Sequence, residues 1–325
     1  MSALAPWQVD NWQLLAGRRG RGTLPHALLI CGAAGLGKRA FADAFAASLL
    51  CLQPQADGSA CGHCRACLLL AAGSHPDRVR VGIELRDDGK PRTEITVEQI
   101  RVLSERLALT AQFGGFQIAT IDPADLMNHA AANALLKTLE EPTPATLIVL
   151  VSDEPARLSA TIRSRCQRVE FRLPAAAEAS AWLTAQGASN EAAAAALRAA
   201  GGNPGLALGW IRGGGMALRD EVGADLKALL NGKAAPLEIA NRWSREDAPT
   251  RLWFAAALAH DEARAAAHGR IGPLALTARP DFTKLSAWFD QANRARALLR
   301  GPLRAELVLL ELLAGIAVQF APARS

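Results

Sequence analysis

A glycine-rich segment between an apolar run and a helical pattern restricts the fold of this chain more than any other feature. Residues 27–31 form a short apolar run typical of a buried strand, and residues 39–50 predict a helix. Between them, residues 32–38 read G-x-x-x-x-G-K. Glycines let main-chain N–H groups converge on phosphate oxygens, a lysine reaches the outer phosphates, and the helix N-terminus adds partial positive charge. This context predicts a phosphate-binding loop, and its expected binding residues are Gly32, Gly35, Gly37 and Lys38.

Two parts that an active loop of this kind needs are missing. Ser or Thr normally follows the lysine, and its hydroxyl binds Mg²⁺. Arg39 stands at that position and would repel a cation. The strand expected at 117–121 ends in Asp122, which could lie near a metal, but Pro123 stands where an ATPase of this kind carries a water-activating Glu. We therefore expect this chain to keep the fold of a P-loop ATPase but not to hydrolyse ATP.

The arrangement of predicted elements changes along the chain. Strands at 27–31, 117–121 and 146–151 alternate with helices at 39–50, from Thr96 onward, and at 129–140. Such alternation predicts a parallel sheet covered on both faces. After about residue 169 almost only helical signals follow, at 175–183, 191–200, 282–300 and 303–318, with a glycine linker at 213–215. The length of 325 residues allows two or three domains of this kind.

Four cysteines lie at spacings typical of a metal site. Cys61, Cys64 and Cys67 form two successive C-x-x-C steps, and Cys51 lies ten residues upstream. Four thiolates at short spacings suit tetrahedral zinc, and the closed set predicts a structural ion. An iron–sulfur cluster and unligated thiols are the alternatives, although the run lacks the fourth cysteine and proline of the ferredoxin type. His63 is expected to be an exposed loop residue, and Cys31 a core residue of its strand.

Targeting signals and charge add weaker constraints. Residues 1–11 lack a basic start followed by an apolar run, and the most apolar stretch, 307–318, contains Glu311. We therefore expect no membrane segment and a cytoplasmic location, where disulfides are rare and clustered cysteines bind metals. The net charge of +5 is spread evenly over both halves of the chain. It permits a phosphate-bearing partner but predicts no nucleic-acid-binding arm.

Two further motifs carry a resemblance to a known family. Residues 132–142 read ANALLKTLEEP, and residues 163–166 read RSRC. Together with the loop and the cysteine insertion after the first helix, they resemble the AAA+ clamp-loader subunits of bacterial DNA replication. The resemblance runs from His26 to about Leu208 in recognisable motifs. Beyond that point it rests on helical character only.

The resemblance implies an α/β fold followed by two helical parts. Residues 1–168 would form a RecA-like AAA+ domain, with a zinc-binding insertion at 51–67. A small helical lid would follow at 169–213, and an all-α collar for oligomerisation at 214–325. In relatives that hydrolyse ATP, a nucleotide-sensing Arg stands near the start of a lid helix. Gly205 occupies that place here, which is a third departure from an ATPase.

The resemblance also implies a role in trans. Arg165, within Ser164-Arg165-Cys166, corresponds to an arginine finger that enters the ATP site of a neighbouring subunit. The chain would have no activity of its own. It would act in a heteropentamer that loads the sliding clamp on primed DNA, as part of a DNA polymerase (nucleotidyltransferase) holoenzyme. The alternatives are a working ATPase with an atypical magnesium site and a zinc-containing DNA-binding module.

Overall fold

The computed structural model describes residues 4–276, 281–299, 301 and 303–320. The chain divides into two compact units. One comprises Met1–Gln186 with Gly202–Leu206, and the other comprises Gly187–Gly201 with Ala207–Ser325.

The first unit is built on a five-stranded parallel sheet. Its strands lie in the order β2-β3-β4-β1-β5. They are β1 (Ala27–Gly32), β2 (Arg78–Val81), β3 (Gln117–Ile121), β4 (Thr146–Ser152) and β5 (Gln167–Phe171). β1 lies inside the sheet, where Leu29 is in register with Leu150 of β4 and Arg168 of β5. β3 and β4 are buried along their whole length, as expected for strands of a sheet covered on both faces. β4 contains the continuous apolar run 147–151, while β3 also buries Gln117 and Thr120.

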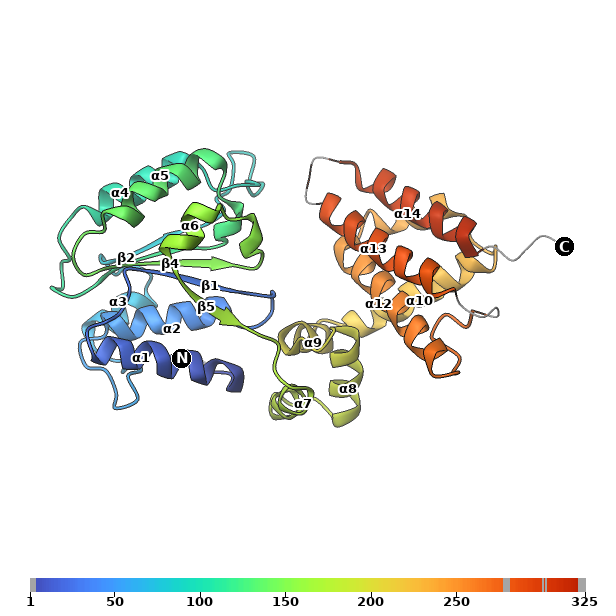
Figure 1. Cartoon of the computed structure of the whole chain (residues 1–325), viewed down its shortest axis with the longest axis horizontal. Helices are drawn as coiled ribbons and strands as arrows, with labels where there is room; N and C mark the ends of the chain where they lie inside the picture. The colour runs from blue at the N-terminus through green and yellow to red at the C-terminus, as the bar shows by residue number, and fades with distance from the viewer. Residues whose placement is uncertain (1–3, 277–280, 300, 302, 321–325) are drawn as a thin grey trace. The chain divides into compact units, whose positions relative to one another are not determined.

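Helices cover both faces of this sheet (Figure 1). One face carries α1 (Val9–Gly20), α2 (Lys38–Leu50) and α3 (Arg65–Ala71), and the other carries α4 (Val97–Leu107), α5 (His129–Glu140) and α6 (Ala160–Arg165). Short 3₁₀ turns lie at Pro6–Gln8, Ala124–Leu126 and Pro155–Arg157. The predicted α/β class and the predicted strands and helices of this region are confirmed. β2 and β5 were not predicted.

Local sequence signals explain where several of these elements begin and pack. Thr96 caps α4 in a capping box with Gln99, as predicted. On the opposite face of the sheet, Trp12 of α1 packs edge-on against Phe41 and Phe45 of α2. α7 (Ala176–Ala185) also belongs to this unit.

The second unit contains helices and no strand among its described residues. Its helices are α8 (Asn190–Ala199), α10 (Gly215–Leu230), α11 (Pro236–Trp243), α12 (Ala248–Ala267), α13 (Phe282–Leu298) and α14 (Ala305–Phe320). α9 (Pro204–Arg212) starts in the first unit and ends in the second. Trp243 and Trp288 are fully buried in the core of the second unit, and Glu262 anchors the following loop by accepting hydrogen bonds from two of its main-chain N–H groups.

Two helix boundaries differ from the expectation. The predicted helix at 303–318 starts two residues later, at Ala305, because its first main-chain hydrogen bonds are accepted by Arg304. The predicted helix at 282–300 ends at Leu298, and residues 300 and 302 lie outside the described residues. The expected glycine linker is also shorter, since Gly214 is left-handed at φ 72° and Gly215 already opens α10.

Candidate functional site

The glycine-rich loop lies between β1 and α2, at the carboxyl end of an inner strand of the sheet. In open α/β sheets this is the edge where ligands bind. Gly35 and Gly37 have φ values of 85° and 77°, a conformation that favours glycine. Lys38 is the first residue of α2. The loop thus lies between a strand and a helix, which is the context that the sequence predicted for it.

The amino group of Lys38 is directed into its own loop. The residue is 3% exposed, and Nζ donates hydrogen bonds to the carbonyl oxygens of Gly32 at 2.7 Å and Ala33 at 2.6 Å. It also forms an ion pair with Asp153 Oδ1 at 2.5 Å. A lysine ammonium has three protons to donate. Two of them are donated to carbonyl oxygens of the loop, and the charge of the ammonium is paired with Asp153.

Arg39 joins two carboxylates at the carboxyl ends of β3 and β4. Its Nε lies 2.7 Å and 3.0 Å from the two oxygens of Asp122. Its Nη2 lies 3.5 Å from Asp153 Oδ2. Burial raises the pKa of Asp122, and Arg39 partly opposes that shift. In an active P-loop NTPase a carboxylate and a hydroxyl at these positions hold Mg²⁺. Here the guanidinium supplies the positive charge.

The N-terminal segment closes one side of the loop. Trp7 Nε1 donates to the carbonyl oxygen of Leu36 at 3.1 Å, and Gln8 Nε2 donates to the same oxygen at 2.9 Å. Trp7 is held in turn by Trp182 of α7, with ring centroids 5.0 Å apart. Neither Trp7 nor Gln8 was singled out from the sequence, because nothing in their spacing connects them to a loop about 30 residues away.

The start of α9 closes another side. Asn203 Nδ2 donates to the carbonyl oxygen of Ala34 at 2.6 Å. A Cβ atom placed on Gly205 would lie 1.7 Å from the carbonyl oxygen of Gly35, which is far inside van der Waals contact. An arginine therefore cannot stand at position 205 unless the loop moves.

The cavity lined by Arg39, Asp43 and Asp122 measures about 220 Å³, below the roughly 300–1,000 Å³ of most ligand pockets.

Arg165 is the last residue of α6, and its side chain is 34% exposed. Nη2 forms an ion pair with Glu140 Oε1 of α5 at 2.7 Å, and Nη1 donates to the carbonyl oxygen of Thr161 at 3.1 Å. Ser164 Oγ donates to the same carbonyl oxygen at 3.0 Å. Cys166 is buried, and burial raises the pKa of its thiol to about 11. Ser164 is exposed and Arg165 is half-buried, so Cys166 is the one buried member of Ser164-Arg165-Cys166.

The four predicted cysteines come together at one point. Cys51 ends α2, Cys64 caps α3, and all four Sγ atoms lie within 4.8 Å of one another. The Cys51–Cys64 and Cys61–Cys67 Sγ distances are 3.9 Å and 4.0 Å. Zn–S bonds of about 2.3 Å in a tetrahedron give S–S edges of roughly 3.8 Å. The residues therefore fit a zinc ion.

Other cysteine and histidine residues lie outside this cluster. His63 is exposed, and its Nδ1 lies 3.0 Å from the carbonyl oxygen of Cys61. Cys31 is fully buried in β1, where Arg168 Nε donates to its Sγ at 3.2 Å. Both positions agree with the expectations from the sequence.

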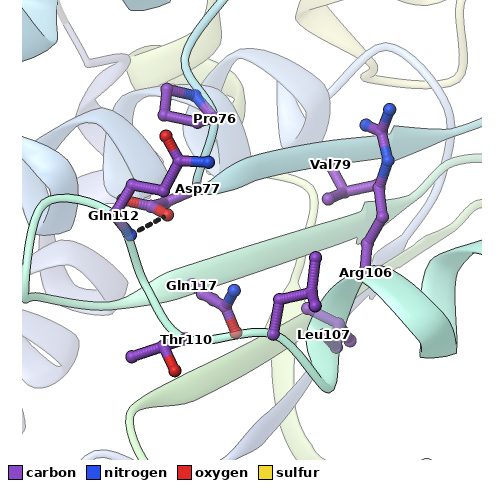
Figure 2. A pocket seen from close by; sticks show the side chains of 9 residues that line it. Pro76, Asp77, Val79, Arg106, Leu107, Thr110, Gln112 and Gln117 are labelled. Atoms are coloured by element: carbon purple, nitrogen blue, oxygen red, sulfur yellow. Dashed lines mark hydrogen bonds between the residues drawn. The ribbon is translucent and has the colours of Figure 1, made fainter.

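A separate hollow of about 260 Å³ lies at the opposite end of the sheet (Figure 2). It is formed where β2 and β3 begin, beside Asp77 and Gln117. The Asp77 carboxylate accepts hydrogen bonds from the main-chain N–H groups of Gln112 at 2.7 Å and Phe113 at 3.0 Å. Because Asp77 is satisfied by the loop that precedes β3, we interpret it as a structural anchor.

Comparison with known proteins identifies the family. Residues 7–175 match the family described as DNA polymerase III, delta subunit. The chain is 42% identical over 259 residues to the DNA polymerase III subunit delta' of Pseudomonas aeruginosa, covering 78% of this chain and 76% of that protein. It is 38% identical over 258 residues to the same subunit of Escherichia coli K12, covering 79% and 75%.

The chain belongs to the delta' subunits of bacterial DNA polymerase III.

The region that matches the family contains the phosphate loop, the four cysteines and Arg165. A DNA polymerase III gamma subunit-related protein of Thermotoga maritima is similar over 96% of this chain and all of that chain, at 18% identity and a TM-score of 0.43. Within the described residues, none of the helices of this delta' subunit combines the length and apolar character needed to cross a membrane. The structure adds five residues to the candidate site that the sequence did not single out, and these are Trp7, Gln8, Glu140, Asp153 and Asn203.

Proposed function

We propose that this delta' subunit is a non-hydrolysing member of the clamp loader. The observation that carries the proposal is the pairing of Lys38 and Arg39 with Asp153 and Asp122. A nucleotide would have to displace the Lys38 contacts to gain its ammonium, and Mg²⁺ would have to displace a guanidinium that already neutralises Asp122. Breaking these ion pairs costs electrostatic energy, and a working ATP site has no such pairs to break.

The proposed contribution to catalysis is made in trans by Arg165. During phosphoryl transfer, negative charge spreads over the γ-phosphate oxygens, and a planar guanidinium stabilises it. Arginine fingers in related reactions raise the rate by roughly 10³–10⁵. The position of Arg165 at the end of α6, with its side chain 34% exposed, supports this role. Ser164 and Cys166 would fix the backbone from which it projects.

We propose that Cys51, Cys61, Cys64 and Cys67 hold a structural zinc ion. A closed set of four thiolates leaves no position for a substrate. The ion would tie the end of α2 to the start of α3, across an insertion with few other buried residues. This role is stabilising and involves no step of the reaction.

Residues 169–325 are proposed to serve assembly with other subunits. We propose a lid at 169–213 and a collar at 214–325, which would pack with other clamp-loader subunits into a heteropentamer. The exposed face of α14 supports this. Leu307 and Val318 are 61% and 79% exposed on this helix, whereas Leu310 is half-buried and packs against the core of the second unit. Exposed large apolar side chains of this kind suit a contact with another subunit. The complex would act in the cytoplasm on the sliding clamp and primed DNA.

The non-hydrolysing assignment is tested by titrating the full-length chain with ATP and Mg²⁺ in a calorimeter. We expect no Mg²⁺-dependent binding and no turnover. An active ATPase with an atypical magnesium site would give both, and that result would contradict the proposal. A DNA-binding module would instead bind DNA tightly as an isolated chain, with an affinity that falls steeply with salt.

A further inference from the structure

The side chain of Arg165 is occupied by its own chain. Glu140 stands at the end of α5, Arg165 stands at the end of α6, and Glu140 Oε1 lies 2.7 Å from Arg165 Nη2. The second terminal nitrogen, Nη1, donates to the carbonyl oxygen of Thr161 at 3.1 Å. Both ends of the guanidinium fork are therefore engaged within this subunit.

This arrangement conflicts with recognition of a phosphate. Arginine binds phosphate and carboxylate groups through the same planar pair of N–H donors. While Nη2 is paired with Glu140, that pair of donors is not free to face a phosphate on another molecule. The paired state and the phosphate-bound state of Arg165 therefore exclude each other.

The contact is also weak enough to exchange. The Arg165 and Glu140 side chains are 34% and 50% exposed, so water screens their attraction. Exposed pairs of this kind shift an equilibrium by roughly 1.5- to 5-fold. A γ-phosphate carries more negative charge than one carboxylate, so it can compete for the guanidinium once it comes within reach.

We propose that Glu140 is a positioning residue that holds Arg165 in a resting conformation until the nucleotide of a neighbouring subunit displaces it. This inference rests on the proposed role of Arg165 in trans. Under this proposal, Glu140 helps determine when Arg165 contacts the nucleotide of the neighbouring subunit. The residue touches no reacting atom, and it acts only through Arg165.

The expected effect of removing the charge has a defined sign. Glu140→Gln keeps the shape of the side chain and loses the ionic attraction. A larger fraction of Arg165 is then free. Without clamp or DNA and at saturating ATP, hydrolysis at the site that faces Arg165 should rise about 1.5- to 5-fold, and the total turnover should rise by that site's share. Because the γ-phosphate of bound ATP competes with Glu140 for the same guanidinium, the KM for ATP at that site should fall by a factor within the same range. Glu140→Asp, which keeps the charge, should lie closer to wild type.

The test uses the reconstituted clamp-loader complex containing the full-length chain, with rates normalised to assembled complex after gel filtration. The variants are Glu140→Gln, Glu140→Asp, Arg165→Ala and the double variant Glu140→Gln/Arg165→Ala. Glu141→Gln is the matched control, since Glu141 is exposed and adjacent and forms no ion pair among the described residues. Thermal unfolding of each isolated variant checks that the fold is retained.

The outcomes separate the two proposals. A rise with Glu140→Gln that disappears in the Arg165→Ala background, and that Glu141→Gln does not reproduce, supports the inference. If Arg165→Ala leaves the rate unchanged, the assignment of Arg165 as an arginine finger is wrong. If Arg165→Ala lowers the rate but Glu140→Gln lowers it or leaves it unchanged, the finger stands and the role of Glu140 is overturned. A rise that persists in the double variant also overturns it.

Discussion

The guanidinium of Arg39 lies against the carboxylate of Asp122, with its Nε 2.7 Å and 3.0 Å from the two oxygens. This contact occupies the place where an active P-loop site would hold a hydroxyl-bound magnesium ion. Together with the ion pair between Lys38 and Asp153, it joins the start of α2 to the carboxyl ends of β3 and β4.

The Arg39–Asp122 contact should be measurable in a double-mutant cycle. Arg39→Ala and Asp122→Asn should each lower the free energy of unfolding, and the double variant should lose less than the sum. Because the Arg39 side chain is 53% exposed, we expect a coupling of only about 0.5–1 kcal/mol. Urea unfolding followed by circular dichroism measures it. Strict additivity would show that the two groups do not interact.

Gly205 should not tolerate any side chain. Gly205→Ala places a Cβ 1.7 Å from the carbonyl oxygen of Gly35, so we expect a loss of about 1–3 kcal/mol in the free energy of unfolding. Gly209→Ala is the matched control on the same helix, where nothing lies within 4 Å, and it should be neutral or stabilising by up to about 1 kcal/mol. Equal effects of the two substitutions would contradict the close approach of α9 to the loop.

The four-cysteine cluster should contain one zinc ion per chain. Metal analysis of the purified protein should find it, and Cys64→Ser should reduce it and destabilise the 61–67 loop more than the sheet. His63→Ala should keep the full zinc content because His63 lies outside the cluster. Absence of metal together with four thiols that titrate in the native protein would refute the site.

The exposed apolar side chains of α14, Leu307 and Val318, should contribute to subunit assembly and not to folding of the isolated chain. Leu307→Glu should weaken incorporation into the reconstituted complex, since a charge would be buried at a subunit contact. Its thermal unfolding should match wild type, because Leu307 is 61% exposed in the isolated chain. Glu311→Gln on the same helix is the control. Normal assembly of Leu307→Glu would remove α14 from the proposed interface.

The sequence predicts the inner part of the first unit well and its edges poorly. β4 contains a continuous apolar run and β3 is mostly apolar, so the signal for both strands is strong. β2 and β5 lie at the edges of the sheet, and charged residues alternate with apolar ones in both, as in RVRV and QRVEF. Strands of four and five residues with this composition are hard to distinguish from loops without their neighbours.

The candidate site shows the same limit. The cysteines and the phosphate loop lie at short spacings, so the sequence alone brings them together. The contacts that occupy the loop come from Gln8, Asp153 and Asn203, which are far apart in the chain and have no motif of their own. Likewise, Glu140 belongs to a recognisable motif, but only the packing of α5 against α6 places it beside Arg165.

The central claim is that this chain supplies Arg165 to a neighbouring ATP site. The most direct measurement is ATP hydrolysis by the reconstituted complex carrying Arg165→Ala, beside Arg163→Ala as a control two residues away on α6. Hydrolysis at the site that faces Arg165 should fall by roughly 10³-fold or more, so the total rate should drop by that site's share. Arg163→Ala should leave the rate of hydrolysis unchanged. A wild-type rate for an assembled Arg165→Ala complex would contradict the account.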